Sequence, residues 1–172
     1  MVAGYWILKP MLAIRTGPAF GCIVPFACRA VFPVVSSAAM ATPKIALLAG
    51  ASGLVGSLLL DELLATSEYS RVYALSRRPL HREHPRLANR VVRFEQLAAE
   101  LKGLAADDAF CCLGTTIAKA GSQTEFRRVD VDLVLAFARV AHAAKVTRFV
   151  VVTSVGADAA AKNFYLRTKG EL

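Results

Sequence analysis

The chain has 172 residues, 55% of them hydrophobic and 20% charged, a composition typical of one globular domain and not of a disordered protein. Its net charge is +8, but the basic residues form short clusters without zinc-ligand spacing or interleaved aromatic residues, so we expect neither nucleic acid nor a metal. Cys22, Cys28, Cys111 and Cys112 form no CxxC motif, which fits a reducing compartment and predicts a cytoplasmic location.

Residues 1–43 are interpreted as an apolar, irregular N-terminal extension. Prolines recur too often there for a long helix, and Arg29 interrupts the apolar stretch 17–39. Three interpretations stay open: upstream sequence before a true start at Met40, a signal or transit segment that implies export or an organelle, or a membrane anchor. A membrane is expected as a partner only under the third, and all three predict that the fold begins at Lys44.

From Lys44 onward, short apolar runs alternate with segments of helical periodicity. Strands are predicted at 44–49, 71–76, 91–94, 108–113 and 149–153, the third with the weakest pattern. Helices are predicted at 54–66 and 125–144. This alternation indicates βαβ units with right-handed crossovers. The predicted fold class is therefore α/β, a Rossmann-type doubly wound parallel sheet of about five strands.

A glycine-rich turn joins the first predicted strand to its helix. Three glycines there meet the demands of a dinucleotide-binding turn, which are a tight turn, close approach of the backbone to phosphate, and close packing of helix on strand. Backbone N–H groups at the start of the helix would face a pyrophosphate along the helix dipole. Because a strand precedes the turn and a helix follows it, we expect a cofactor there and not an empty turn. The predicted cofactor-binding residues of this segment are Gly50, Ser52, Gly53, Leu54, Val55 and Gly56.

The end of the second predicted strand bears on which dinucleotide fits. NAD sites place Asp or Glu there for the ribose hydroxyls, whereas NADP sites use arginine for the 2′-phosphate. Ser76, Arg77 and Arg78 occupy this place without a carboxylate beside them. A guanidinium binds phosphate through paired hydrogen bonds. We therefore expect these three residues to bind the cofactor and NADP(H) to be preferred over NAD(H); the alternative is two solvated arginines in a loop.

Tyr165 and Lys169 are four residues apart, which places both side chains on one face of a helix. A tyrosine hydroxyl alone is a poor acid–base group at neutral pH, but a nearby ammonium favours the phenolate and makes proton exchange with a carbonyl or alcohol feasible. Ser154, at the end of the fifth predicted strand, can orient the same substrate oxygen. Such pairs are common on helix surfaces, but after this glycine turn we expect Ser154, Tyr165 and Lys169 to form a catalytic site.

These features resemble the atypical and extended short-chain dehydrogenase/reductases. The resemblance is carried by the turn at 50–56, the run Cys-Leu-Gly-Thr-Thr at 112–116, the strand and serine at 148–154 and the Tyr-x-x-x-Lys pair at 165–169. The Cys-Leu-Gly-Thr-Thr run, with Ala-Gly at 120–121 and Val-Gly-Ala-Asp at 155–158, looks most like the Tat-interacting-protein branch and its bacterial relatives.

The resemblance implies a role for individual residues. Ser154 would orient the substrate carbonyl, Thr153 beside it would share that role, and Tyr165 would exchange the proton. Lys169 would bind the nicotinamide ribose and favour the tyrosine phenolate. The cofactor-binding residues implied beyond the glycine turn and the arginines are Gly114, Thr115, Thr153, Tyr165 and Lys169.

The sequence thus predicts an NADP(H)-binding oxidoreductase of the short-chain dehydrogenase/reductase type, which transfers hydride to or from a carbonyl or alcohol. A small-molecule substrate is the expected partner, and a homodimer is a candidate assembly. The alternative, from another class, is a non-catalytic dinucleotide-binding redox sensor or scaffold. Family members continue past the Tyr-x-x-x-Lys helix with elements that shape the substrate pocket, so we expect the NAD(P)-binding domain at 44–172 to be incomplete at its C-terminus.

Overall fold

A computed structural model describes residues 42–172 of the chain. The interpretations of the N-terminal extension concern residues that lie almost wholly outside this part. Within it, the first strand begins at Lys44, where the apolar pattern predicted the fold to begin. None of the helices in the described part is long and apolar enough to cross a membrane.

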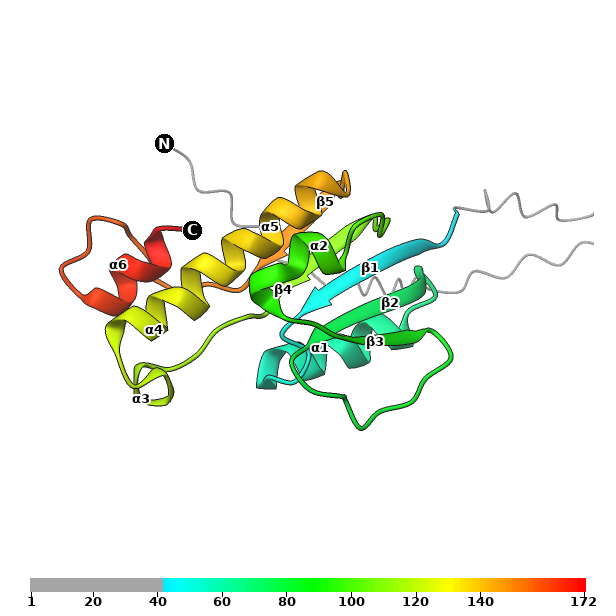
Figure 1. Ribbon diagram of the computed structural model, residues 1–172, viewed down its shortest axis with the longest axis horizontal. Helices are drawn as coiled ribbons and strands as arrows, with labels where there is room; N and C mark the ends of the chain where they lie inside the picture. Colours follow the sequence, from blue (N-terminus) through cyan, green and yellow to red (C-terminus); the bar gives the residue numbers. More distant parts are fainter. Residues whose placement is uncertain (1–41) are drawn as a thin grey trace, which may run out of the picture. The chain divides into compact units, whose positions relative to one another are not determined.

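Five parallel strands form one sheet in the order β3-β2-β1-β4-β5 (Figure 1). The strands are β1 (Lys44–Ala49), β2 (Tyr69–Ser76), β3 (Leu87–Val91), β4 (Asp108–Cys111) and β5 (Arg148–Val151). The chain runs outward from β1 to β3 and then returns to the other side of β1. The strand order therefore reverses between β1 and β4, and in open α/β sheets ligands bind outside the carboxyl ends of the strands at such a point.

Helices pack on both faces of this sheet, as the doubly wound prediction requires. The helical segments are α1 (Leu54–Ala65), the 3-10 turn η1 (Phe94–Gln96), α2 (Leu97–Glu100), α3 (Ile117–Ala120), α4 (Gln123–Arg127), the π-helical turn η2 (Arg128–Asp132), α5 (Leu133–Ala143) and α6 (Phe164–Gly170). Helix α1 packs against one face, and η1, α2 and α5 pack against the other. The predicted five-stranded Rossmann-type sheet is confirmed.

Strand β1 lies at the centre of the sheet and is buried on both sides. Ala46 and Leu48 belong to the core under α1, whereas Leu47 and Ala49 belong to the core under α2 and α5. All four are fully buried. A strand covered on both faces needs a continuous apolar run and not an alternating one, which is why the sequence identified it readily.

The third strand was predicted at 91–94, and this was wrong. Strand β3 covers Leu87–Val91, and Val72 of β2 pairs with Leu87. Val92 and Phe94 are buried, but they follow the strand and fill the core beside α2. As an edge strand, β3 is mostly half-buried, so the residues after it carry the stronger apolar signal.

The predicted helix at 125–144 consists of α4, η2 and α5 in direct succession. The π-helical turn η2 widens the backbone, and the Leu133 N–H bonds to the Arg128 carbonyl oxygen five residues back. Asp130 and Val131 within this turn are buried. Single π turns inside α-helices are rare and frequently occur at functional sites.

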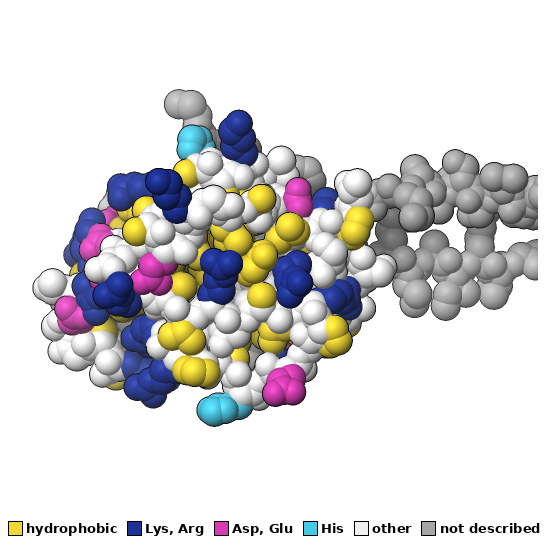
Figure 2. Space-filling view, turned by 45° about the vertical axis from the view of Figure 1, so that its right-hand side comes forward, with side chains coloured by type: hydrophobic (Ala, Val, Ile, Leu, Met, Phe, Trp, Pro, Cys, Tyr) yellow, Lys and Arg dark blue, Asp and Glu magenta, His cyan; other side chains and the backbone are white. Residues whose placement is uncertain are grey.

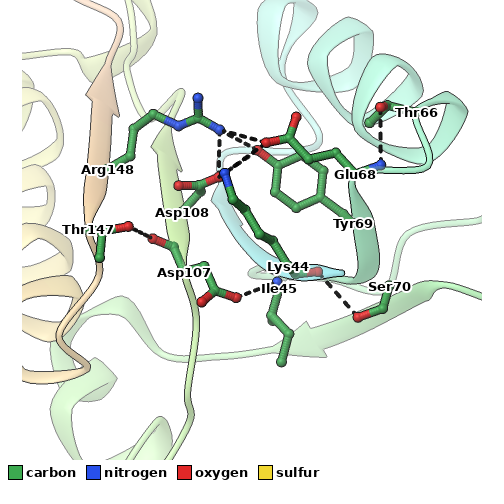
Figure 3. Close-up of polar contacts among 10 residues, drawn as sticks. All are labelled: Lys44, Ile45, Thr66, Glu68, Tyr69, Ser70, Asp107, Asp108, Thr147 and Arg148. Carbon is green, nitrogen blue, oxygen red and sulfur yellow. Dashed lines mark hydrogen bonds and ion pairs between the residues drawn. The ribbon is translucent and has the colours of Figure 1, made fainter. Parts of the chain in front are cut away.

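A cluster of polar side chains joins the amino ends of four strands (Figure 3). Asp108 at the start of β4 is buried and accepts hydrogen bonds from the Tyr69 hydroxyl at 2.8 Å and from Arg148 Nη2 at 2.6 Å. Lys44 Nζ lies 3.6 Å from the same carboxylate. Burial raises the pKa of Asp108, but the hydrogen bonds from Arg148 and Tyr69 outweigh it, so the pKa lies below its usual range. The cluster lies at the sheet edge opposite the predicted cofactor site, so we assign it to stability.

Candidate active site

The turn between β1 and α1 brings the backbone of β1 against the end of β4. Gly50 has a φ of +88°, and a Cβ built on it would lie 2.5 Å from the Cys112 carbonyl oxygen. A Cβ on Gly56 would overlap the Gly50 carbonyl oxygen. These two positions therefore require glycine for the fold itself.

Gly53 is different, because a Cβ there would meet only the Gly50 carbonyl oxygen, at 3.4 Å. Its backbone N–H donates to the same oxygen at 3.0 Å. Little in the described protein thus demands glycine at this position. The fold leaves space at Gly53 for a phosphate to approach the backbone, which is the role expected of the second glycine in such a turn.

The first turn of α1 carries large apolar side chains that are open to solvent. Leu54 is 82% exposed and Val55 50% exposed, although both are large apolar residues. Gly53 is the N-cap residue, and no side chain of the described chain caps this helix end there. Free N–H groups at the positive end of a helix of this length form a ready anion site. The turn therefore fits the pyrophosphate of a dinucleotide.

At the carboxyl end of β2, Ser76 is buried and holds the following loop. Its hydroxyl donates to the Arg78 carbonyl oxygen at 2.6 Å and accepts from Asn89 Nδ2 at 2.8 Å. Asn89, on β3, also accepts from the Leu80 N–H at 2.8 Å. Arg77 and Arg78 are exposed in this loop. Asn89 was missed from the sequence because its role depends on contacts across two strands, which local spacing does not reveal.

The sequence around Arg77 contains no carboxylate, but the fold brings one near. Glu95 of η1 forms an ion pair with Arg128 at 2.8 Å. The pKa of Glu95 lies below its usual value, chiefly through a backbone hydrogen bond and further through the charges of Arg128 and Arg77. The Arg77 charge thus acts on Glu95, a carboxylate that is ion-paired with Arg128.

The Lys and Arg side chains do not form one continuous tract. Figure 2 shows them spread over one face, with apolar side chains between them and few acidic ones. Several basic side chains are engaged in exposed ion pairs, such as Arg93 with Glu100 and Arg82 with Asp61. The net positive charge is thus distributed, as the short clusters in the sequence predicted.

Helix α6 carries Tyr165 and Lys169 on one face. Lys169 Nζ lies 6.0 Å from the centroid of the Tyr165 ring. The ring is half-buried and packs against Phe126 of α4 at 5.6 Å between centroids. Asn163 caps the helix, since its side chain accepts a hydrogen bond from the Leu166 N–H at 3.2 Å. The four-residue spacing therefore places the two side chains together, as predicted.

The segment after β5 carries the two hydroxyls that the sequence singled out. Ser154 is half-buried, and its Oγ donates to the Val155 carbonyl oxygen at 3.3 Å. Thr153 Oγ1 donates to the Lys169 carbonyl oxygen at 3.2 Å, so Thr153 anchors α6 to the end of the sheet. The hydrogen bonds among residues 42–172 include none between Ser154 and Tyr165. In this structure, Thr153 has a different hydrogen-bonding role from Ser154.

Asp130 is the residue of this region that sequence analysis missed. Its Oδ1 lies 2.5 Å from Lys169 Nζ, and its Oδ2 accepts a hydrogen bond from the Thr115 N–H at 2.9 Å. Gly114 lies against the pair, because a Cβ there would be 3.4 Å from Asp130 Oδ1. The available signal was spacing: Asp130 lies four residues from Phe126 and from Val134, both buried on the same helical face.

These contacts join four of the predicted site residues, Gly50, Gly114, Thr115 and Lys169, at the carboxyl edge of the sheet. Gly50 touches the end of β4, and Gly114 and Thr115, just beyond that end, meet Lys169 through Asp130. The arginines lie at the end of the neighbouring strand β2. A hollow of about 590 Å³ between α2 and α5, lined by Leu97, Leu101 and Val140 among others, contains none of these residues.

The parallel sheet, the glycine turn at its switch point and the Tyr-x-x-x-Lys helix define a Rossmann-type dinucleotide-binding protein. The family model described as NAD(P)H-binding matches residues 50–171. The chain belongs to this NAD(P)H-binding family.

Relatives with known names support this membership. The chain is 40% identical over 133 residues to Protein HTATIP2 of Rattus norvegicus, a match that covers 75% of this chain and 54% of the rat protein. It is 34% identical over 127 residues to "Protein FMP52-1, mitochondrial" of Scheffersomyces stipitis, covering 72% of this chain and 56% of that protein. The chain thus spans about half the length of the curated relatives it matches. The identity to Protein HTATIP2 agrees with the expected likeness to the Tat-interacting-protein branch, and the family that the matches show is the NAD(P)H-binding one.

Solved structures show the same fold at lower identity. Uronate dehydrogenase from Agrobacterium tumefaciens matches with a TM-score of 0.60 and 16% identity, over 74% of this chain and 52% of that one. MoeE5 in complex with UDP-glucose and NAD matches with a TM-score of 0.58 and 24% identity, over 72% of this chain and 45% of that one. At such identities these structures establish the fold and carry no argument about substrate.

Proposed function

We propose that this protein is an NADP(H)-dependent oxidoreductase of the short-chain dehydrogenase/reductase type, acting on a carbonyl or alcohol. The observation that carries the proposal is a contact between the loop after β4 and helix α6 at the carboxyl edge of the sheet. There, Gly114 and Thr115 of the loop and Lys169 of α6 surround Asp130. Membership in an NAD(P)H-binding family supports cofactor binding. The choice of NADP(H), the hydride transfer and the substrate class are the proposed part.

The residues present fit a dinucleotide. The uncapped backbone N–H groups of Leu54 and Val55 would hold the pyrophosphate, Gly53 leaves room for it, and Gly50 and Gly56 keep the turn closed beneath it. Gly114 and Thr115 would lie along the nicotinamide half. The exposed guanidinium groups of the loop after β2 would bind the 2′-phosphate, and the Glu95–Arg128 ion pair lessens the repulsion of that phosphate by Glu95.

The bound nicotinamide supplies or accepts the hydride. On this chain, the Tyr165 hydroxyl gives its proton to the substrate oxygen as a carbonyl is reduced, and takes it back from an alcohol in the reverse direction. The Lys169 ammonium beside the ring stabilises the phenolate that this transfer leaves. For the Ser154 hydroxyl to hold the same substrate oxygen, it would turn from the Val155 carbonyl oxygen and donate its one proton to the substrate.

Steady-state assays of the protein with NADPH and a panel of aldehydes, ketones and quinones test the proposal. NADPH consumption that depends on one carbonyl class supports it. Tight NADPH binding without turnover of any panel member would instead favour the non-catalytic redox sensor or scaffold. Failure to bind NADPH in an equilibrium titration would refute both functions.

The cellular location is proposed as a reducing compartment, on the basis of two free thiols in the described part of the chain, Cys111 and Cys112. Burial raises the pKa of Cys111 to about 11, so its thiol stays protonated and unreactive at neutral pH. The cytoplasm remains our proposal, and the word "mitochondrial" in the names of the yeast relatives favours the organellar alternative. Fractionation of cells that express the tagged full chain distinguishes the two.

A further inference from the structure

Asn89 on β3 is a half-buried amide that binds the loop carrying the two exposed arginines from both of its ends. Its Oδ1 accepts a hydrogen bond from the Leu80 N–H at 2.8 Å. Its Nδ2 donates to the Ala74 carbonyl oxygen at 3.0 Å and to Ser76 Oγ at 2.8 Å. One side chain thus bridges the end of β2 and the residue that follows the segment 77–79.

The partners of these bonds determine the direction of each one. The Leu80 N–H can only donate and the Ala74 carbonyl oxygen can only accept, so the amide has a single orientation that satisfies both. The Ser76 hydroxyl gives its one proton to the Arg78 carbonyl oxygen at 2.6 Å and therefore accepts from Asn89. Both donors and the carbonyl oxygen of the Asn89 amide are engaged with the loop and its strand.

This network also bears on how Ser76, predicted from the sequence to bind the cofactor, takes part in the site. A phosphate at neutral pH offers acceptors, so a hydroxyl binds it by donating a proton. The proton of Ser76 is given to Arg78, and the residue is only 4% exposed. Arg77 and Arg78 are exposed instead, and neither guanidinium takes part in a hydrogen bond or ion pair among residues 42–172. These contacts favour the arginines as the groups that meet a phosphate and Ser76 as a group that holds their backbone.

Two further features restrict the same segment. Pro79 follows Arg78, and the residue before a proline is biased toward extended backbone conformations. The Leu80 side chain is half-buried and packs against the core under α1. The backbone that bears the arginines is therefore fixed at Ser76 on one side and at Leu80 on the other, and Asn89 binds both of these residues.

We infer that Asn89 is a positioning residue for cofactor choice, which fixes the loop after β2 so that Arg77 and Arg78 present their guanidinium groups to the 2′-phosphate of NADP(H). The inference rests on the proposed function, because the arginines matter only where that phosphate is bound. The 2′-phosphate is the group that distinguishes NADP(H) from NAD(H). A residue that acts through these arginines therefore affects the discrimination between the two dinucleotides and not the contacts that they share.

The physical argument is one of preorganisation. A loop that is fixed before the ligand arrives loses little conformational entropy on binding, whereas a mobile loop loses it when the complex forms. Arginine side chains already lose much rotamer freedom when they are ordered, so a fixed backbone leaves only the side chains to be ordered. Removal of the Asn89 amide leaves the Leu80 N–H without its acceptor and frees the Ser76 hydroxyl from one of its two partners. The loop should then become mobile, and the phosphate should be bound less tightly.

The first measurement follows the loop of the full chain without cofactor. Asn89→Ala removes all three bonds of the amide, and the control Ser70→Ala removes a hydrogen bond to the Lys44 carbonyl oxygen at the opposite end of β2. Hydrogen exchange of backbone amides is followed by NMR, with the fully buried Leu47 of β1 as the reference for opening of the core. Relative to Leu47, the Leu80 amide should exchange about tenfold faster or more in Asn89→Ala, and within about twofold of wild type in Ser70→Ala.

The second measurement is an equilibrium titration with NADPH and with NADH. In Asn89→Ala, NADPH affinity should fall about tenfold while NADH affinity stays within about twofold of wild type, and Ser70→Ala should change neither beyond about twofold. A variant that lacks both guanidinium groups, Arg77→Ala/Arg78→Ala, tests the route of the effect. Adding Asn89→Ala to it should lower NADPH affinity by less than about twofold, because Asn89 acts through the arginines. A residue that serves stability alone would not change the ratio of the two affinities.

Each outcome decides either the inference or the proposed function. If Asn89→Ala does not fold, Ser76→Ala replaces it, because it removes the bond to the Arg78 carbonyl oxygen and should show the same selective loss of NADPH affinity. Wild-type values for the affinity ratio or for Leu80 exchange, or a full further loss in the variant without guanidinium groups, would overturn the inference and leave the proposed function standing. If wild type binds neither dinucleotide, the proposed function fails, and the role of Asn89 in cofactor choice fails with it.

Discussion

A Cβ on Gly56 would overlap the carbonyl oxygen of Gly50. The first turn of α1 is thus packed directly on the backbone that leaves β1, with no space for a methyl group. Gly53 lies between these two glycines in the chain but is free of such a restriction, since its nearest neighbour would be 3.4 Å away. The same motif therefore contains glycines that serve the fold and a glycine left for the ligand.

This difference predicts opposite effects for two single-methyl substitutions. Gly56→Ala should lower the free energy of unfolding by about 1–3 kcal/mol, because the added atom has to displace backbone. Gly53→Ala should change stability by less than about 1 kcal/mol yet weaken NADPH binding by tenfold or so, because the methyl group obstructs the phosphate. Urea unfolding and equilibrium titration of both variants check this. Equal losses of stability would contradict the distinction.

Cofactor preference should depend on the loop after β2. Arg77→Ala is expected to weaken NADPH binding by roughly 1–3 kcal/mol, the usual scale for a lost hydrogen bond between charged groups, and to leave NADH unchanged. Arg71→Ala is the matched control, since Arg71 is an exposed arginine near the start of the same strand. Fluorescence titrations with both dinucleotides measure the difference. Equal curves for NADPH and NADH in wild type would remove the basis of the preference.

The cluster around Asp108 predicts a pH dependence of stability. Because hydrogen bonds from Arg148 and Tyr69 hold the folded-state pKa of Asp108 below its usual value, the ionised group stabilises the fold above its unfolded pKa. That contribution is lost as the pH falls through the folded pKa. Asp108→Asn should therefore cost roughly 1–3 kcal/mol at about pH 7, and the difference from wild type should shrink below about pH 4.

Urea unfolding at both pH values measures this, with Asp61→Asn as the control. Asp61 forms an exposed ion pair with Arg82, and such surface pairs contribute little. A difference between wild type and Asp108→Asn that stays constant from neutral to acidic pH would show that the cluster acts through packing and not through charge.

Most features of the fold and of the candidate site that the sequence predicts come from motifs within short segments. The glycine turn and the Tyr165–Lys169 pair each lie within one short segment, so spacing alone indicated how their side chains would be arranged. Asp130 and Lys169 meet across the fold, as do Arg148 and Asp108, which are 40 residues apart. Such contacts depend on strand order and crossover packing, which no local spacing encodes. For the same reason, the apolar pattern at Val92 and Phe94 predicts a strand, whereas these residues fill the core beyond the strand end.

The environment of Arg77 shows the same limit. Along the chain, no carboxylate accompanies the arginines after β2, and the absence of one favoured NADP(H). In the folded protein, η1 brings Glu95 near, and Arg128 from η2 compensates it. The residues at the end of β2 alone therefore do not determine cofactor preference. The position of η1, which follows the neighbouring strand β3, has to be known as well.

The last prediction concerns the chemistry itself. In assays with NADPH and an active carbonyl substrate, Tyr165→Phe should lower kcat by about 10²–10⁴-fold, the contribution expected of a positioned acid–base group. The ring and its packing against Phe126 at 5.6 Å remain, so NADPH affinity should stay within about twofold of wild type. Lys169→Ala should lower both kcat and NADPH affinity, because the ammonium is expected to contact the ribose and to support the tyrosine. Turnover in Tyr165→Phe that approaches the wild-type rate would refute the proposed proton transfer, whatever the cofactor preference proves to be.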